Sequence, residues 1–165
     1  MNSNKKIILA LIVLAGTAAF STASISTMYF QTVRTSALVC QKYSSAEGTL
    51  DYENRGVINN SRTENVQANC PVNLGPAEGS YRIDVVAFAR NSGGGKTVTC
   101  KLLEIDSLSG TFAAKYQNSV YVSNGSAGLL TWRDIEARTP ESVFTLNCDL
   151  PPKHGLISIS VTEEI

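Results

Sequence analysis

Short runs in which apolar and polar residues alternate recur along the chain, and they predict β-strands. In the segment 81–90, YRIDVVAFAR, every odd-numbered residue is apolar, and the intervening positions include Arg82 and Asp84. The segments 142–150, SVFTLNCDL, and 155–163, GLISISVTE, alternate in the same way. Because successive side chains of a strand point to opposite faces, each run has one face suited to a core.

Turn-forming residues separate these runs, and no sustained helical repeat is found beyond a possible turn in 131–138, TWRDIEAR. The segment 91–96, NSGGGK, joins two alternating runs and predicts a hairpin with a longer loop. About nine short strands result, which predicts an all-β fold, an antiparallel β-sandwich. We expect a single sandwich domain over residues 37–165, preceded by a leader segment at 24–36.

The first 23 residues have the pattern of a secretory signal peptide. Lys5 and Lys6 precede an uncharged apolar run, 7–20, and small residues follow at 21–23. The apolar run is shorter than the ~20 residues that a membrane-spanning helix needs. We therefore predict a secreted or periplasmic protein of bacterial type with no stable membrane anchor after cleavage, the alternative being an uncleaved N-terminal anchor.

The charge balance argues against a nucleic-acid partner. The chain has 14 Lys and Arg residues and 14 Asp and Glu residues. Removal of Lys5 and Lys6 with the signal peptide leaves a small acidic excess and no basic run. Because nucleic-acid binding depends on neutralising phosphates, that class of function is disfavoured, as is a polybasic membrane-surface mode.

Four cysteines in an exported chain predict two disulfides. Three pairings are possible, and we favour Cys40–Cys70 and Cys100–Cys148, because the members of each pair occupy similar places in their alternating segments. No C-x-x-C motif is present, and the spacings do not match a zinc site, so we expect no metal and no cofactor. The single histidine, His154, lies in PPKHG and is expected to be a solvated turn residue.

Three aromatic residues between 111 and 133 are the candidate ligand-binding residues. Trp132, Tyr116 and Tyr121 lie in a less regular region, and sugar rings stack on exposed aromatic faces. The favoured alternative for Trp132 is the core, where a tryptophan buries a large area. Exposure of the Trp132 side chain therefore distinguishes the two interpretations.

Catalytic motifs are absent from the sequence. It contains no G-x-S-x-G or H-E-x-x-H, and GGGK lacks the spacing of a phosphate-binding loop. Two carboxylate pairs, Asp51 with Glu53 and Asp134 with Glu136, could serve a hydrolase, although solvated surface carboxylates commonly have this spacing. Calcium could bind Asp51, Glu53 and Asn54, but the pattern is not that of an EF-hand.

Several short motifs resemble those of a bacterial family. They are G-x-x-N-x-S in 56–61, V-x-x-x-C-P-V in 66–72, C-x-L at Cys100 and L-x-C-x-L-P-P in 146–152. With the signal peptide, they are similar to a family of small exported bacterial disulfide-containing β-proteins of uncharacterised activity. The resemblance implies a secreted β-domain and brings no catalytic residues with it.

The sequence therefore predicts a non-catalytic exported binding or structural module with a protein or glycan ligand. The first alternative is a carbohydrate-binding module that uses Trp132 and the nearby tyrosines. The second alternative is a hydrolase that depends on paired carboxylates.

Overall fold

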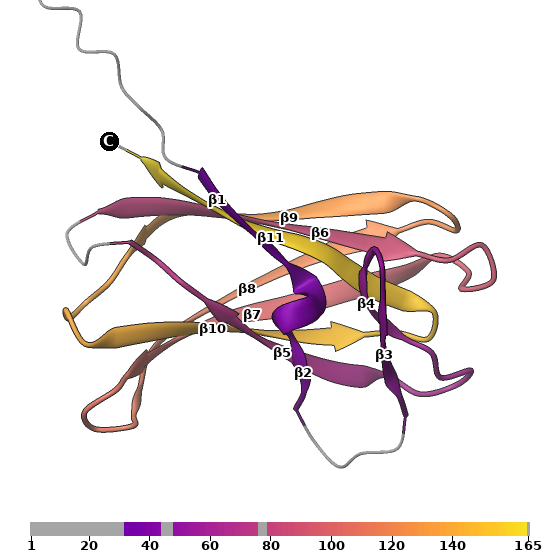
Figure 1. The fold of residues 1–165 in the computed structure, drawn as a ribbon, viewed down its shortest axis with the longest axis horizontal. Helices are drawn as coiled ribbons and strands as arrows, with labels where there is room; N and C mark the ends of the chain where they lie inside the picture. The colour runs from indigo at the N-terminus through magenta and orange to yellow at the C-terminus, as the bar shows by residue number, and fades with distance from the viewer. Residues whose placement is uncertain (1–31, 44–47, 76–78, 165) are drawn as a thin grey trace, which may run out of the picture.

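The computed structural model describes residues 32–43, 48–75 and 79–164, and over these residues the protein is a two-sheet antiparallel sandwich (Figure 1). Eleven strands and one short 3₁₀ helix occur in this part of the chain. The predicted all-β sandwich is thus confirmed, with more strands than the nine expected from the sequence. The predicted signal peptide, 1–23, lies outside the described residues.

Sheet A contains six strands, with β11 at its centre. Its strands are β1 (Thr32–Ser36), β3 (Leu50–Glu53), β4 (Gly56–Asn59), β6 (Ser80–Ala89), β9 (Ala127–Glu136) and β11 (His154–Glu164). One edge of β11 pairs with β6, which in turn pairs with β9. The other edge is shared, because β4 pairs at Gly155 and Leu156 and β1 pairs from Ser158 to Thr162.

Sheet B contains five strands in the order β2-β5-β10-β7-β8. Its strands are β2 (Gln41–Lys42), β5 (Val66–Val72), β7 (Lys96–Asp106), β8 (Phe112–Val122) and β10 (Ser142–Leu150). The 3₁₀ helix η1 (Ala37–Val39) connects β1 of sheet A to β2 of sheet B. The segment 24–36, which the sequence analysis treats as a leader, therefore includes a paired strand, β1.

The core lies between the two sheets and is built mainly from alternate residues of the longer strands. In β6 and β10, buried and half-buried positions alternate, as the period of a strand requires. The Trp132 side chain is 6% exposed and belongs to this core. Opposite Arg82, β9 has a bulge that includes Asp134, with φ of 53°, so both Trp132 and Ile135 point inward.

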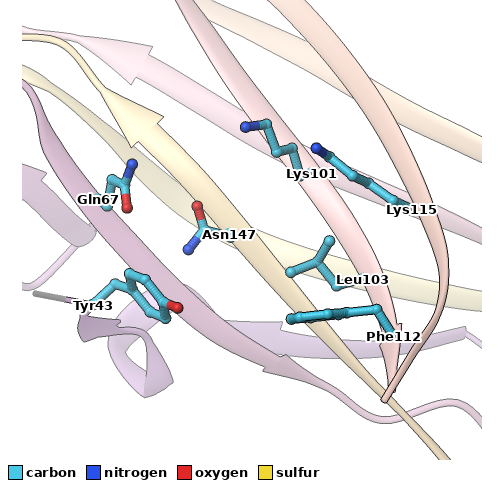
Figure 2. A pocket seen from close by; sticks show the side chains of 7 residues that line it. All are labelled: Tyr43, Gln67, Lys101, Leu103, Phe112, Lys115 and Asn147. Carbon is cyan, nitrogen blue, oxygen red and sulfur yellow. The ribbon is translucent and has the colours of Figure 1, made fainter. Parts of the chain in front are cut away.

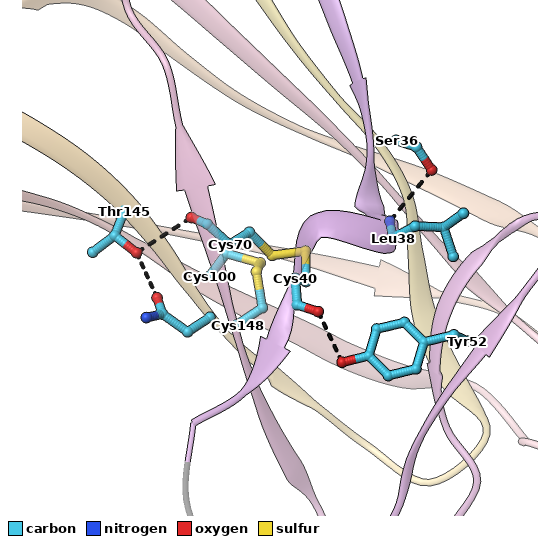
Figure 3. The surroundings of a disulfide bond; sticks show 9 residues. Ser36, Leu38, Cys40, Tyr52, Cys70, Cys100, Thr145 and Cys148 are labelled. Atoms are coloured by element: carbon cyan, nitrogen blue, oxygen red, sulfur yellow. Dashed lines mark hydrogen bonds between the residues drawn. A yellow bond between two sulfur atoms is a disulfide. The ribbon is translucent and has the colours of Figure 1, made fainter.

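Both predicted disulfides are present, and both join neighbouring strands of sheet B (Figure 3). Cys100 and Cys148 face each other across β7 and β10, with a Cα–Cα distance of 4.0 Å. Cys40 immediately precedes β2 and faces Cys70 of β5, also at 4.0 Å. All four cysteines are fully buried on the inner face of the sheet. The disulfides indicate an oxidising location outside the cytoplasm.

The expectation of a solvated His154 is wrong. This side chain is completely buried, with Nδ1 at 2.9 Å from the carbonyl oxygen of Pro152 and Nε2 at 3.4 Å from that of Val122. The physical reason is the position of the turn, which ends at Lys153 in a left-handed conformation, with φ of 62°. His154 is then the first residue of β11, and its side chain enters the protein interior.

Among the described residues, no helix combines the length and apolar character needed to cross a membrane.

Candidate functional site

An open groove lies on the outer face of sheet B (Figure 2). Its volume is about 380 Å³, within the size range of ligand sites. It is lined by Tyr43, Gln67, Lys101, Leu103, Phe112, Lys115 and Asn147. We call this feature the sheet B groove.

Strand alternation and register bring the groove residues together from distant parts of the sequence. Inward-facing Cys148 and Leu146 leave Asn147 on the outer face of β10, where it lies directly opposite Lys101 of β7. Leu103 is in turn opposite Lys115 of β8. Directly opposite side chains in an antiparallel pair have Cβ atoms about 4.5–5.5 Å apart. The floor of the groove is therefore continuous across adjacent strands.

Two exposed aromatic side chains lie at opposite sides of the groove. Tyr43 follows β2, where its backbone N–H donates to the Gln67 carbonyl at 2.9 Å, and its side chain is 61% exposed. Phe112 begins β8 and is 69% exposed. Measured across the sheet alone, four inter-strand spacings, roughly 19 Å, separate their two strands, so a ligand that touches both rings must be elongated.

The described part of the protein does not use the polar side chains inside the groove for its own hydrogen bonding. Within the described residues, Gln67, Lys101, Lys115 and Asn147 make no side-chain hydrogen bond or ion pair. Several surrounding outward side chains do pair with one another, in Asn69–Thr145, Asn65–Asp149 and Thr99–Ser119. The groove therefore brings together four polar side chains whose hydrogen-bonding groups the described part of the protein does not itself use.

A second hollow of about 380 Å³ adjoins the first on the same face of sheet B. It is lined by Val39, Gln41, Asn69, Pro71, Val143, Phe144 and Thr145. The Thr145 hydroxyl already donates to the Asn69 side chain. The second hollow thus lacks the exposed aromatic pair and much of the free polar capacity of the sheet B groove.

The turn before Phe112 is held by Asp106. Its carboxylate accepts hydrogen bonds from the backbone N–H groups of Leu108, at 2.9 Å, and Ser109, at 3.3 Å. These bonds favour the charged form and lower the pKa of Asp106 below its usual value. The β7–β8 turn that leads into one wall of the groove is therefore fixed by a local carboxylate.

The three aromatic residues singled out from the sequence are not brought together. Trp132 of β9 points into the core between the two sheets and is buried there. Tyr116 and Tyr121 lie on β8, where Tyr116 is half-buried and packs against the core. Tyr121 is 67% exposed but does not line the sheet B groove.

Sequence reasoning missed both aromatic side chains that flank the groove. Tyr43 lies at the start of a polar stretch that predicts a loop, and Phe112 lies near the start of a short candidate strand, after the turn residues Ser109 and Gly110. The one available signal is a large apolar residue next to a turn. Large apolar residues are usually buried in the core, so one that lies beside a turn can mark an exposed binding surface.

The carboxylate pairs considered for hydrolysis lie outside the sheet B groove. Asp51 accepts a hydrogen bond from Asn60 at 2.6 Å, and Glu53 forms an ion pair with Arg90. Asp134 and Glu136 are exposed on β9. In the part of the chain that the structure describes, no three His, Cys, Asp or Glu residues are grouped to hold a metal ion.

No protein-family model matches the chain, and no curated protein matches it. Several solved β-sandwich structures are similar. A xylan-binding module, CBM15, has a TM-score of 0.46 and 10% identity, over 81% of this chain and 97% of that one.

A family 11 carbohydrate-binding module from Clostridium thermocellum, in complex with a β-1,3-1,4-mixed-linked tetrasaccharide, has a TM-score of 0.40 and 7% identity, over 85% and 89% of the two chains. A CBM4 structure has a TM-score of 0.39 and 16% identity, and the match covers 60% of this chain and 61% of that one. At this level of similarity, the ligands of these modules are not assigned to this protein.

Proposed function

We propose that the protein is a non-catalytic, exported glycan-binding module and that its binding site is the sheet B groove. The observation that carries the proposal is that two exposed aromatic rings, Tyr43 and Phe112, flank the groove. The amide side chains that lie between them have no protein partner among the described residues. This is the carbohydrate-binding alternative of the sequence analysis, placed on different aromatic residues.

The chemistry of the groove suits a sugar. A pyranose ring has an apolar C–H face, which packs against the electron-rich face of an aromatic ring. It also has an edge of hydroxyl groups that both donate and accept hydrogen bonds. Gln67 and Asn147 each offer an NH₂ donor and a carbonyl acceptor, which matches such an edge. A chain of several sugars would reach from Tyr43 to Phe112.

The non-catalytic part of the proposal rests on where the acids lie. The candidate carboxylates Asp51 and Glu53 already have protein partners, and neither lines the groove. A glycoside hydrolase needs two carboxyl groups on either side of the scissile bond, within about 5–10 Å of each other. A secreted or periplasmic location agrees with the two disulfides and with the predicted signal peptide.

Titration of the purified protein with plant and bacterial polysaccharide fragments tests the proposal, with heat of binding as the readout. Tyr43→Ala and Phe112→Ala should each weaken binding about five- to tenfold, since one stacking contact is worth about 1 kcal/mol or somewhat more. Tyr121→Ala is the matched control, because Tyr121 is equally exposed and lies outside the groove.

Loss of binding in Tyr121→Ala but not in the groove variants would move the site to the residue first suggested by the sequence. Absence of binding to every glycan would reject the proposal and direct the search to protein ligands. Trp132 fluorescence is a poor readout, because the indole is buried in the core.

A further inference from the structure

Two lysines lie at the same side of the sheet B groove (Figure 2). Lys101 of β7 pairs with Gln117 of β8, and Leu103 pairs with Lys115. The two lysines are therefore diagonal neighbours on adjacent strands. Diagonal neighbours are about 7–8 Å apart at their bases, a distance that long side chains can bridge. Both ammonium groups can thus approach one bound group.

No carboxylate of the groove balances these charges. The lining includes no Asp or Glu, and within the described ranges neither lysine makes an ion pair. Asp149 is the outward acid diagonal to Lys101, and its carboxylate accepts a hydrogen bond from Asn65 at 2.9 Å. Glu104 is on the inner face of β7, fully buried, and accepts hydrogen bonds from Arg138 N–H and the Ser142 hydroxyl.

Neighbouring like charges on a sheet repel each other, and an anion bound between them relieves this repulsion. The remainder of the groove is uncharged, with two amides, a leucine and two aromatic rings. An occupant complementary to all of these groups has apolar ring faces, hydroxyl groups and negative charge.

We propose that the ligand of the sheet B groove is an acidic polysaccharide, with the carboxylate of a uronic acid unit bound by Lys101 and Lys115. The inference rests on the proposed glycan-binding function and narrows its ligand class. Because the groove spans more than one sugar, a polymer with a charge on each unit places a carboxylate at the lysines in every register. The adjoining rings of the polymer pack against Tyr43 and Phe112.

The test compares oligogalacturonates with the same oligomers after full methyl esterification, which removes the charge and keeps the sugar backbone. At low salt, the acid form should bind about five- to tenfold more tightly, and the preference should shrink as salt is added. The double variant Lys101→Gln/Lys115→Gln should bind both forms with similar affinity. Lys96→Gln, an exposed charge change on the same strand, should keep the wild-type preference.

Tyr43→Ala separates the two proposals, since loss of stacking should weaken the acid and ester forms equally. Equal binding of both forms by the wild-type protein, or a preference that survives the double variant, would overturn the acidic-ligand inference and leave glycan binding standing. Failure of both forms and of neutral glycans to bind would reject both proposals. Equally tight, lysine-dependent binding of dextran sulfate or single-stranded DNA would also overturn the inference, because it would reveal unspecific attraction of polyanions.

Discussion

Two regions of the outer surface, the Asp84 cluster on sheet A and the groove on sheet B, use their polar side chains in different ways. On sheet A, Asp84 accepts a hydrogen bond from the Thr131 hydroxyl at 2.6 Å and forms an ion pair with Arg82 at 2.9 Å. Thr32 and Thr162 pair at 3.0 Å across β1 and β11. In the sheet B groove, four long polar side chains have no such partner within the described residues.

This difference separates stabilising polar groups from groups that can serve recognition. A cross-strand pair contributes to the stability of its sheet. An unpartnered surface group is hydrated instead, and a ligand that replaces its water can gain the hydrogen bond. The named pairs on sheet A therefore stabilise their own sheet, whereas the four polar side chains of the sheet B groove are left available to another molecule.

The covalent links are distributed just as unevenly, because all four cysteines serve sheet B. Of the three changes considered, removal of one disulfide should lower the free energy of unfolding the most. Cys100→Ala/Cys148→Ala opens a 48-residue loop, and the chain-entropy relation predicts a loss of about 4 kcal/mol in the free energy of unfolding. Chemical denaturation of the oxidised wild type and the variant measures this loss. A difference under about 1 kcal/mol would show that hydrogen bonding and packing alone hold sheet B.

A second prediction contrasts one polar residue from each outer face. Asp84→Ala should cost about 1–2 kcal/mol of unfolding free energy, since it leaves Thr131 and Arg82 without their partner at a partly buried site. Asn147→Ala should change stability by less than about 0.5 kcal/mol, because Asn147 has no side-chain partner among the described residues. Urea denaturation of both variants gives the comparison, and equal losses would contradict the division of roles between the two faces.

The smallest effect is expected at Asp106, in the turn that leads to Phe112. Its pKa is lowered in the folded protein, so the charged carboxylate stabilises the fold above the ordinary value of 3.8. This contribution is lost as the pH falls through the lowered folded-state pKa. Asp106→Asn keeps an acceptor oxygen without the charge, so wild type should exceed it in stability at pH 7 and lose that advantage in acid. The free energy of unfolding of both proteins, measured from pH 7 downward, checks this prediction. A difference between wild type and variant that does not change with pH would contradict it.

Much of the sandwich could be predicted from the sequence because its long strands alternate strictly. The segments of β6 and β10 each have one apolar and one mixed face. The alanines of β6 and the cysteine of β10 belong to the apolar face, which points into the core. The disulfide pairing followed from the similar places that the two cysteines of each pair occupy in their own alternating segments. His154 could not be placed, since its burial depends on where a turn ends and on the Val122 carbonyl, far away in the sequence.

The candidate site could not be predicted because it depends on strand order. Tyr43 and Phe112 are separated by five other described strands along the chain, yet they line one groove. The order β2-β5-β10-β7-β8 is not sequential, and no local pattern encodes it. Residue type alone offered Trp132 as a candidate, with the core as the favoured interpretation, and its large apolar ring does fill the core.

The strand order also has a consequence for when the protein can fold. Without β10 and β11, sheet B divides into the pairs β2–β5 and β7–β8, and sheet A into β3–β4, β6–β9 and a lone β1. Isolated two-stranded pairs are at best marginally stable in water, and distant strand pairings form slowly. A chain synthesised from its N-terminus therefore cannot complete either sheet until β10 and β11 have been made.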